Sequence, residues 1–287
     1  MLPKKKPLSD TLKQDYIPPE NCIEAKSFHS VPAINQVNSE NHKFLQHIIN
    51  TSNNTLEGVQ GQMQIQFEND QNTYVGSGTL CIFGQGFKSN KYFLLTCAHN
   101  LVDLSENHQT IKYANKITYY YSRRNYKTYF CRLLAENFVL HPGYFFNNKM
   151  DDGFDLSLVK LTKQQIMKDA PVSTNSFWGI PLEESGATQG SVIKIIGYPS
   201  SASGELYSID GIIKEINFHD DGQALILYDI LSACPGQDGS PVYLKMGDNH
   251  WTIVGVHLGY SLTKNSFIGT GLTKNIHKWI NKQQQIL

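Results

Sequence analysis

The sequence predicts an all-β protein, built as a barrel or a sandwich. Short segments rich in β-branched and aromatic residues recur from about residue 60 to residue 270, and turn residues separate them at short intervals. The composition agrees, because 22 glycines, 15 tyrosines and 14 phenylalanines favour strands and turns over helices. Alternating strands and helices, the pattern of a parallel α/β sheet, are not indicated.

Length, charge and hydropathy limit the kind of protein further. A chain of 287 residues suits a core of roughly 220 residues with extensions, or two small domains. Hydrophobic residues make up 40% and the formal net charge is zero, so neither a disordered chain nor a nucleic-acid partner is expected. No apolar run reaches the roughly 18 residues that a membrane span needs.

The first half of the chain contains most of the clear strand patterns. Residues 63–67 alternate apolar and polar side chains, as a half-buried strand does. Further strands are expected at residues 74–83, 92–98, 111–121, 128–139 and 156–161. Residues 162–188 are less regular and include Pro171 and Pro181, which predicts a connection between two halves.

Strand patterns resume in the second half, and a helix is expected to end it. The strands are predicted at residues 191–197, 205–216, 224–228, 241–245, 252–257 and 267–270. In the tail, Leu272, Ile276, Trp279 and Ile280 share one helical face. A helix over residues 273–284, docked on the second half, is therefore expected.

Residues 1–57 read as an extension, either a flexible leader or an arm that folds onto a partner. Residues 43–49 could form two helical turns within it. The basic N-terminal stretch lacks the apolar core of a signal peptide. The expected location is therefore intracellular, either cytoplasmic or within an organelle or cytoskeletal assembly.

The cysteines are expected to be reduced thiols. Their number is odd, and the spacings of Cys22, Cys81, Cys97, Cys131 and Cys234 show no metal-binding pattern. A bond between Cys81 and Cys97 stays open if their strands lie side by side. The histidines are scattered and no phosphate-binding glycine loop precedes a helix, so neither a metal nor a cofactor is predicted.

Three motifs follow one another in an order that suggests acyl-transfer chemistry. His99 comes just after the apolar segment 94–98, and Asp155 stands at the head of the strand-like segment 155–161. A glycine-rich turn, 236–240, comes last and runs into a strand. Such a turn can aim a side chain and two backbone N–H groups at one point, as a nucleophile beside an oxyanion hole requires.

With these motifs the chain resembles the trypsin/chymotrypsin-like serine peptidases, and within them the glutamyl-endopeptidase branch. Thr-Cys-Ala-His at residues 96–99 resembles the family's Thr-Ala-Ala-His, and residues 155–161 resemble the segment around its aspartate. Leu-His-Pro-Gly-Tyr at 140–144, Gly-Tyr-Pro at 197–199 and Gly-Val-His-Leu-Gly at 255–259 add to the match.

The resemblance covers residues 58–285 and implies a chymotrypsin-like double β-barrel with a C-terminal helix and an N-terminal extension. The first barrel would span residues 58–165, the connection 166–188, and the second barrel with its helix 189–285. It leaves residues 1–57 without a counterpart.

One residue departs from the family's pattern at the nucleophile. The branch reads Gly-(Asn/Gln)-Ser-Gly-Ser-Pro-Val, whereas residues 236–242 read Gly-Gln-Asp-Gly-Ser-Pro-Val. The alignment needs no gap, so Asp238 stands at the nucleophile and Ser240 at the family's second, non-catalytic serine. Sliding the alignment by two residues would displace Gly239 and Pro241 from their family positions.

Aspartate at this position opposes acyl transfer. A carboxylate attacks an amide poorly, and its charge lies where an oxyanion must develop, against the N–H donors of Gly236 and Asp238. Loss of the nucleophile in serine proteases costs on the order of 10⁶ in turnover. His99 would lie between the carboxylates of Asp155 and Asp238, which predicts a charged imidazole with a raised pKa.

The specificity pocket that the resemblance implies is also altered. His257 matches the histidine that holds a substrate carboxylate, although it could equally be a satisfied core or cleft histidine. The family's threonine is replaced by Ala233, and Ser232 could substitute for it in part. Gln237 stands where activated trypsins carry an aspartate that pairs with the new N-terminus, so activation by that ion pair is not expected.

Two functions follow from these residues. The first is a catalytically inactive homologue that acts as a binding or structural module, expected in a larger assembly, with protein partners and an extended peptide in the cleft. The alternative is an active serine endopeptidase of the glutamyl type, with Ser240 as nucleophile or an unusual mechanism.

Overall fold

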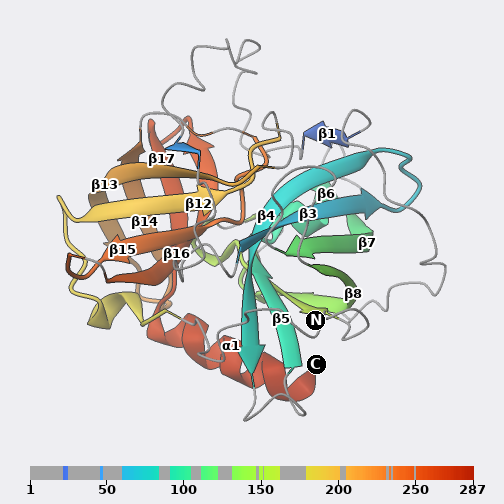
Figure 1. Ribbon diagram of the computed structural model, residues 1–287. Helices are drawn as coiled ribbons and strands as arrows, with labels where there is room; N and C mark the ends of the chain where they lie inside the picture. Colours follow the sequence, from blue (N-terminus) through green and yellow to red (C-terminus); the bar gives the residue numbers. More distant parts are fainter. Residues whose placement is uncertain are drawn as a thin grey trace.

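The computed structural model describes two β-barrels, packed side by side, and a C-terminal helix (Figure 1). The described residues are 22–24, 46–47, 60–83, 91–104, 111–121, 131–146, 149–150, 152–161, 179–200, 205–230, 233, 235–248 and 250–287. The all-β class and the chymotrypsin-like double barrel expected from the sequence are confirmed.

The first barrel closes through a ring of paired strands. Its order is β4-β3-β7-β8-β11-β5, and pairing of β4 with β5 completes the ring. Apolar side chains such as Met63, Leu94, Ile117 and Val159 fill it. The strands are β3 (Gln60–Phe67), β4 (Thr73–Phe83), β5 (Lys91–Thr96), β7 (Ile111–Tyr121), β8 (Cys131–Leu140) and β11 (Ser157–Leu161).

The second barrel repeats this arrangement. Its order is β12-β15-β16-β17-β14-β13, closed by pairing of β12 with β13. Ile193, Ile209, Ile226 and Val254 are among the side chains that form its core. The strands are β12 (Val192–Gly197), β13 (Tyr207–Phe218), β14 (Ala224–Ile230), β15 (Pro241–Lys245), β16 (Trp251–Ser261) and β17 (Ser266–Gly271).

The strand limits differ from the sequence predictions in a few places. Strand β8 begins at Cys131 rather than at residue 128, and β16 continues to Ser261 rather than ending at residue 257. A bulge between His257 and Gly259 interrupts the alternation that the sequence pattern relies on, yet pairing with β17 continues beyond it. Within the barrels, three short strands were not predicted: β6 (Val102–Leu104), β9 (Phe145–Phe146) and β10 (Lys149–Met150).

The C-terminal helix α1 (Lys274–Ile286) forms as expected, but it contacts more than the second barrel. The hydroxyl of Thr273 accepts a hydrogen bond from the Ile276 amide at 3.3 Å and caps the first turn. The buried face joins a cluster with side chains from both barrels, and the Trp279 ring lies 4.8 Å from that of His141. No described helix is long and apolar enough to cross a membrane.

Two pieces of the N-terminal extension add short strands to the barrels. Strand β1 (Cys22–Glu24) runs parallel to the start of β4, and β2 (Gln46–His47) runs antiparallel to the start of β13. The two helical turns that residues 43–49 could form are therefore absent at residues 46–47. Strand β14 pairs with β13 only from Gly211 onward. The first residues of β13 therefore have backbone N–H and C=O groups on that edge that another extended segment can hydrogen-bond. The other residues of the extension lie outside the described ranges.

Cys81 and Cys97 are free, buried thiols. Their strands are neighbours, as the open alternative required, but Cys81 lies opposite Phe93. Cys97 is four residues further along, roughly 13 Å at the rise of a strand, which is beyond the reach of a disulfide. The side chains of the other three cysteines lie outside the described part of the chain.

Candidate active site

Strand pairing brings His99 and Asp155 to the same end of the first barrel. His99 opens a short 3₁₀ turn, η4 (His99–Leu101), three residues after β5 ends. Asp155 follows a second such turn, η5 (Asp152–Phe154), just before β11. Because β5 and β11 pair antiparallel, with Thr96 opposite Ser157, the end of one strand meets the start of the other.

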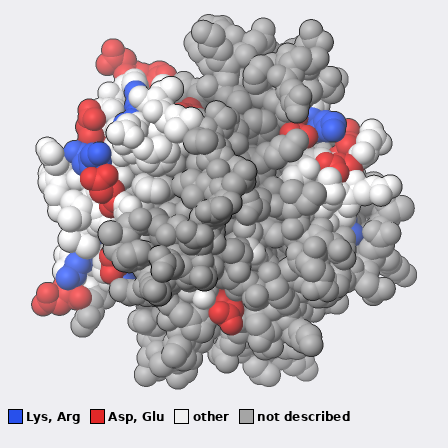
Figure 2. Space-filling view, turned by 90° about the horizontal axis from the view of Figure 1, so that it is seen from above, with Lys and Arg blue, Asp and Glu red and all other residues white. Residues whose placement is uncertain are grey.

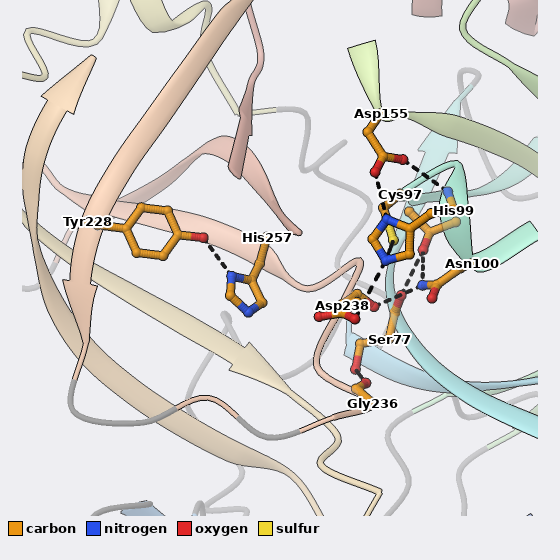
Figure 3. Close-up of polar contacts among 10 residues, drawn as sticks. Ser77, Cys97, His99, Asn100, Asp155, Tyr228, Gly236, Asp238 and His257 are labelled. Carbon is orange, nitrogen blue, oxygen red and sulfur yellow. Dashed lines mark hydrogen bonds and ion pairs between the residues drawn. The ribbon is translucent and has the colours of Figure 1, made fainter. Parts of the chain in front are cut away.

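Asp155 holds His99 at two points. Its Oδ2 lies 2.6 Å from His99 Nδ1, and its Oδ1 accepts the His99 backbone N–H at 3.0 Å. Both residues are almost completely buried. The contact makes Nδ1 the protonated donor and turns Nε2 toward the second barrel (Figure 3).

Asp238 occupies the place in front of His99. Its Oδ2 lies 3.5 Å from His99 Nε2. Its backbone carbonyl accepts hydrogen bonds from the Ser77 amide at 3.0 Å and from Asn100 Nδ2 at 2.9 Å. The Ser77 hydroxyl donates to the Gly236 carbonyl at 2.7 Å. The first barrel therefore fixes the loop of the second barrel from several sides.

Gly239 explains why the loop needs glycine directly after Asp238. Its φ of +88° lies in the left-handed region that L side chains avoid. A Cβ at this position would also stand 2.2 Å from Thr96 Oγ1 and 2.3 Å from the Ser77 carbonyl. The close approach of the two barrels at this point therefore depends on the missing side chain.

The two amides that the sequence suggests as an oxyanion hole have no backbone acceptor among the described residues. These are the N–H groups of Gly236 and Asp238. By contrast, the Gly239 amide donates to the His257 carbonyl at 2.8 Å, and the Ser240 amide donates to the Gln237 carbonyl at 2.9 Å. The Gly236 and Asp238 amides are thus not used by the described backbone, whereas the next two amides are.

Ser240 lies away from His99. It is fully buried, and its hydroxyl packs against the end of β12: a Cβ on Gly197 would stand 1.9 Å from Ser240 Oγ. The described contacts of His99 Nε2 are with Asp238 and with Cys97, whose Sγ is 3.4 Å away. The structure therefore brings Asp238, and not Ser240, to His99.

His257 lies on β16, buried in the second barrel, with Tyr228 as its partner. Tyr228 Oη is 2.6 Å from His257 Nδ1 and donates its one proton to the Ile268 carbonyl at 2.7 Å. Nδ1 must therefore carry the hydrogen of that contact, which leaves Nε2 with a lone pair. Among the described residues, Nε2 has no hydrogen-bond partner.

The other pocket residues are placed only in part. Ala233 is half-buried and packs against the core of the second barrel. Ser232 lies outside the described residues. The contacts that Ser77 and Asn100 make with the Asp238 loop, and Tyr228 with His257, were not predicted. Each of these is an ordinary polar residue on a strand or turn, and no sequence motif includes it.

The two histidines are expected in opposite charge states. Burial disfavours the charge on His99, but the charge of Asp155, together with hydrogen bonds to Asp155 and Asp238, outweighs it and raises the His99 pKa well above 6.5. Burial lowers the pKa of His257 to about 4, against a smaller opposing effect of Asp238. Burial also raises the pKa of Cys97 to about 11, so this residue stays a thiol at neutral pH.

Charges elsewhere on the described surface are mixed. Figure 2 shows lysine side chains interspersed with acidic ones on the face it presents, without a large patch of one sign among the described residues. Surface ion pairs such as Lys194–Asp210 and Lys214–Asp229 belong to this pattern. The described residues hold no group of three or more His, Cys, Asp or Glu side chains that could bind a metal.

The charge on His99 can be tested by NMR. We expect the imidazole to remain protonated at pH 7, because Asp155 and Asp238 both favour the charged form. Asp155→Asn should lower its pKa more than Asp238→Asn, since Asp155 makes the closer, two-point contact. Histidine side-chain ¹⁵N spectra, assigned with His99→Gln, would show this. A neutral His99 in the wild type at pH 7 would contradict the expected ion pair.

His257 should make the protein less stable in acid. The unfolded chain protonates this histidine below about pH 6.5, whereas the folded protein resists protonation until about pH 4. The free energy of unfolding should therefore fall between these pH values, by on the order of 3 kcal/mol from this residue. Denaturation of His257→Gln should show a shallower pH dependence, and the exposed control His219→Gln should match the wild type. Identical slopes for all three would contradict the prediction.

Comparison with known proteins places the fold in a class. No family model matches the chain, and no curated protein does. Among solved structures, a Glu endopeptidase matches with a TM-score of 0.59 and 18% identity, over 84% of this chain and 96% of that one. A thermostable serine protease, AL20, from an extremophilic microorganism matches with a TM-score of 0.53 and 16% identity, over 77% and 94%. The protease Anisep from Arthrobacter nicotinovorans matches with 0.52 and 16%, over 77% and 93%. The chain therefore has the fold of the trypsin/chymotrypsin-like serine proteases.

Proposed function

We propose that the protein is a catalytically inactive homologue of the serine endopeptidases whose fold it shares, and that it acts as a binding or structural module in a protein assembly. One observation carries the proposal: the side chain that faces His99 Nε2, at 3.5 Å, is the carboxylate of Asp238. A peptidase of this fold needs a hydroxyl there.

The state of His99 supports the same conclusion. A general base must accept a proton at Nε2, and an imidazole that is already charged cannot do so. The two carboxylates that flank His99 favour this charged form. The charge of Asp238 also lies beside the Gly236 and Asp238 amides, where the negative oxygen of a tetrahedral intermediate would develop.

The alternative is an active glutamyl-type endopeptidase. It is supported by the contact between His99 and Asp155 and by the Gly236 and Asp238 amides, which have no backbone acceptor among the described residues. It would need Ser240 as nucleophile. That hydroxyl is fully buried against Gly197, so the loop would have to rearrange before Ser240 could reach a substrate.

A binding function needs a surface for a peptide but no nucleophile, and one edge of strand β16 offers such a surface. Strand β15 pairs with β16 only as far as Val256, whereas β17 pairs with β16 as far as Ser261. Residues 258–261 therefore have one edge without a strand partner among the described residues. An extended peptide can add to such an edge through main-chain hydrogen bonds. Residues 1–57 would tether the module to its assembly in this proposal.

A fluorophosphonate probe tests the catalytic part of the proposal. The probe reacts only with an activated serine, so wild-type protein should label no more than His99→Gln or Ser240→Ala. Gel fluorescence, with an active serine endopeptidase as positive control, measures the labelling. Wild-type labelling that is lost in both variants would establish Ser240 as a working nucleophile and overturn the proposal.

A further inference from the structure

The buried site carries one unbalanced negative charge. Asp155 and Asp238 contribute two carboxylates and His99 one cation, and the three side chains are only 2%, 7% and 2% exposed, respectively. Asp155 contacts His99 through two atoms, the closer at 2.6 Å, whereas Asp238 approaches it at 3.5 Å. Asp238 is therefore the carboxylate with the weaker compensation, and a buried carboxylate is costly without a full partner.

The second oxygen of Asp238 faces the backbone of β16 at Gly259. A Cβ on Gly259 would stand 3.2 Å from Asp238 Oδ1 and 3.9 Å from its Cγ, and it would meet no other described atom within 4 Å. Gly259 has a φ of +107° and lies just past the bulge in β16. The missing side chain thus lets the backbone of β16 approach the carboxylate closely, next to the strand edge where a peptide can pair.

His257 adds a second acceptor on the same side of Asp238. Its Nε2 carries a lone pair, is fully buried and has no hydrogen-bond partner among the described residues. Figure 3 shows Asp238 between the two histidines, and the charge of Asp238 acts on both His257 and Tyr228. Two hydrogen-bond acceptors, a carboxylate oxygen and an imidazole nitrogen, are therefore available around Asp238 on the side of the second barrel.

From these two acceptors and the net negative charge, we infer that the cleft beside Asp238 binds a cationic group of a peptide, namely a lysine or arginine side chain. We also infer that it discriminates against glutamate. An ammonium or guanidinium group supplies only donors and a positive charge, which matches two acceptors and a net negative site. A glutamate carboxylate would bring a third negative charge and would need a donor at His257 Nε2. Burial keeps the imidazole neutral at neutral pH, and the contact of Nδ1 with Tyr228 leaves Nε2 without a hydrogen.

This inference rests on the proposed binding function and reverses the preference that the His257 match to glutamyl endopeptidases would suggest. The reversal comes from Asp238. With serine at this position, His257 would face a neutral hydroxyl, whereas here it faces a charge of the same sign as a glutamate ligand.

Matched peptides test the inference. Fluorescein-labelled hexapeptides that differ only at the fourth residue, lysine, glutamine or glutamate, are titrated with the full-length protein and followed by anisotropy. We expect the lysine peptide to bind at least about tenfold more tightly than the glutamine peptide, and the glutamate peptide to bind more weakly than both. Asp238→Asn should remove the advantage of lysine, and the exposed control Asp248→Asn should keep it.

Each outcome separates this inference from the function on which it rests. Glutamate binding as tight as lysine binding, or a lysine preference that survives in a folded Asp238→Asn protein, would overturn the inference and leave an inactive module. Absence of binding by all three peptides up to millimolar concentration would overturn it as well. Cleavage of the bound lysine peptide would overturn catalytic inactivity but uphold the cationic preference. The wild-type comparison of lysine with glutamate stands even if a variant fails to fold.

Discussion

Two hydrogen bonds to one backbone carbonyl hold the site together. The carbonyl of Asp238, in the second barrel, accepts from the Ser77 amide and from Asn100 of the first barrel. These bonds, with the close contact allowed by Gly239, fix the loop against the neighbouring barrel. The Asp238 side chain is thereby held in front of His99, and the electrostatics of the cleft follow from that placement.

The cleft keeps the frame of an acyl-transfer site but reverses its charge requirements. A working site holds a neutral base beside a hydroxyl and reserves its amides for a developing negative charge. In the state that we propose, the base is charged, a carboxylate stands in place of the hydroxyl, and the amides lie beside that carboxylate. The same groups that oppose catalysis favour binding of a positive ligand, so the proposed inactivity and the inferred ligand class have one physical origin.

Sequence patterns predicted much of the fold, because strand alternation and turn residues are local signals. The sequence also predicted the C-terminal helix, because Leu272, Ile276 and Trp279 share one helical face. The differences lie where tertiary pairing decides the outcome: residues 46–47 could have formed part of two helical turns, but they pair with an edge of β13. Tertiary pairing also settles the open alternative of a Cys81–Cys97 bond, because Cys81 lies opposite Phe93 and both thiols stay free, as expected.

The candidate site was predictable only in its motif residues. His99, Asp155 and Asp238 stand at positions that the resemblance identifies, and the structure brings them together. The partner of His257 was not predictable, because Tyr228 is 29 residues away in sequence and meets it only through the pairing of β14, β17 and β16. Such contacts form only when the barrel closes, so the local pattern of a single sequence segment does not indicate them.

The most direct test of the account compares peptide hydrolysis by the wild type and by Asp238→Ser. Both proteins are incubated with one mixture of peptides, and new termini are identified by mass spectrometry. The account predicts no new termini from the wild type and new termini from Asp238→Ser, because serine would restore a nucleophile beside an intact His99 and Asp155. Wild-type products that disappear in His99→Gln would contradict it.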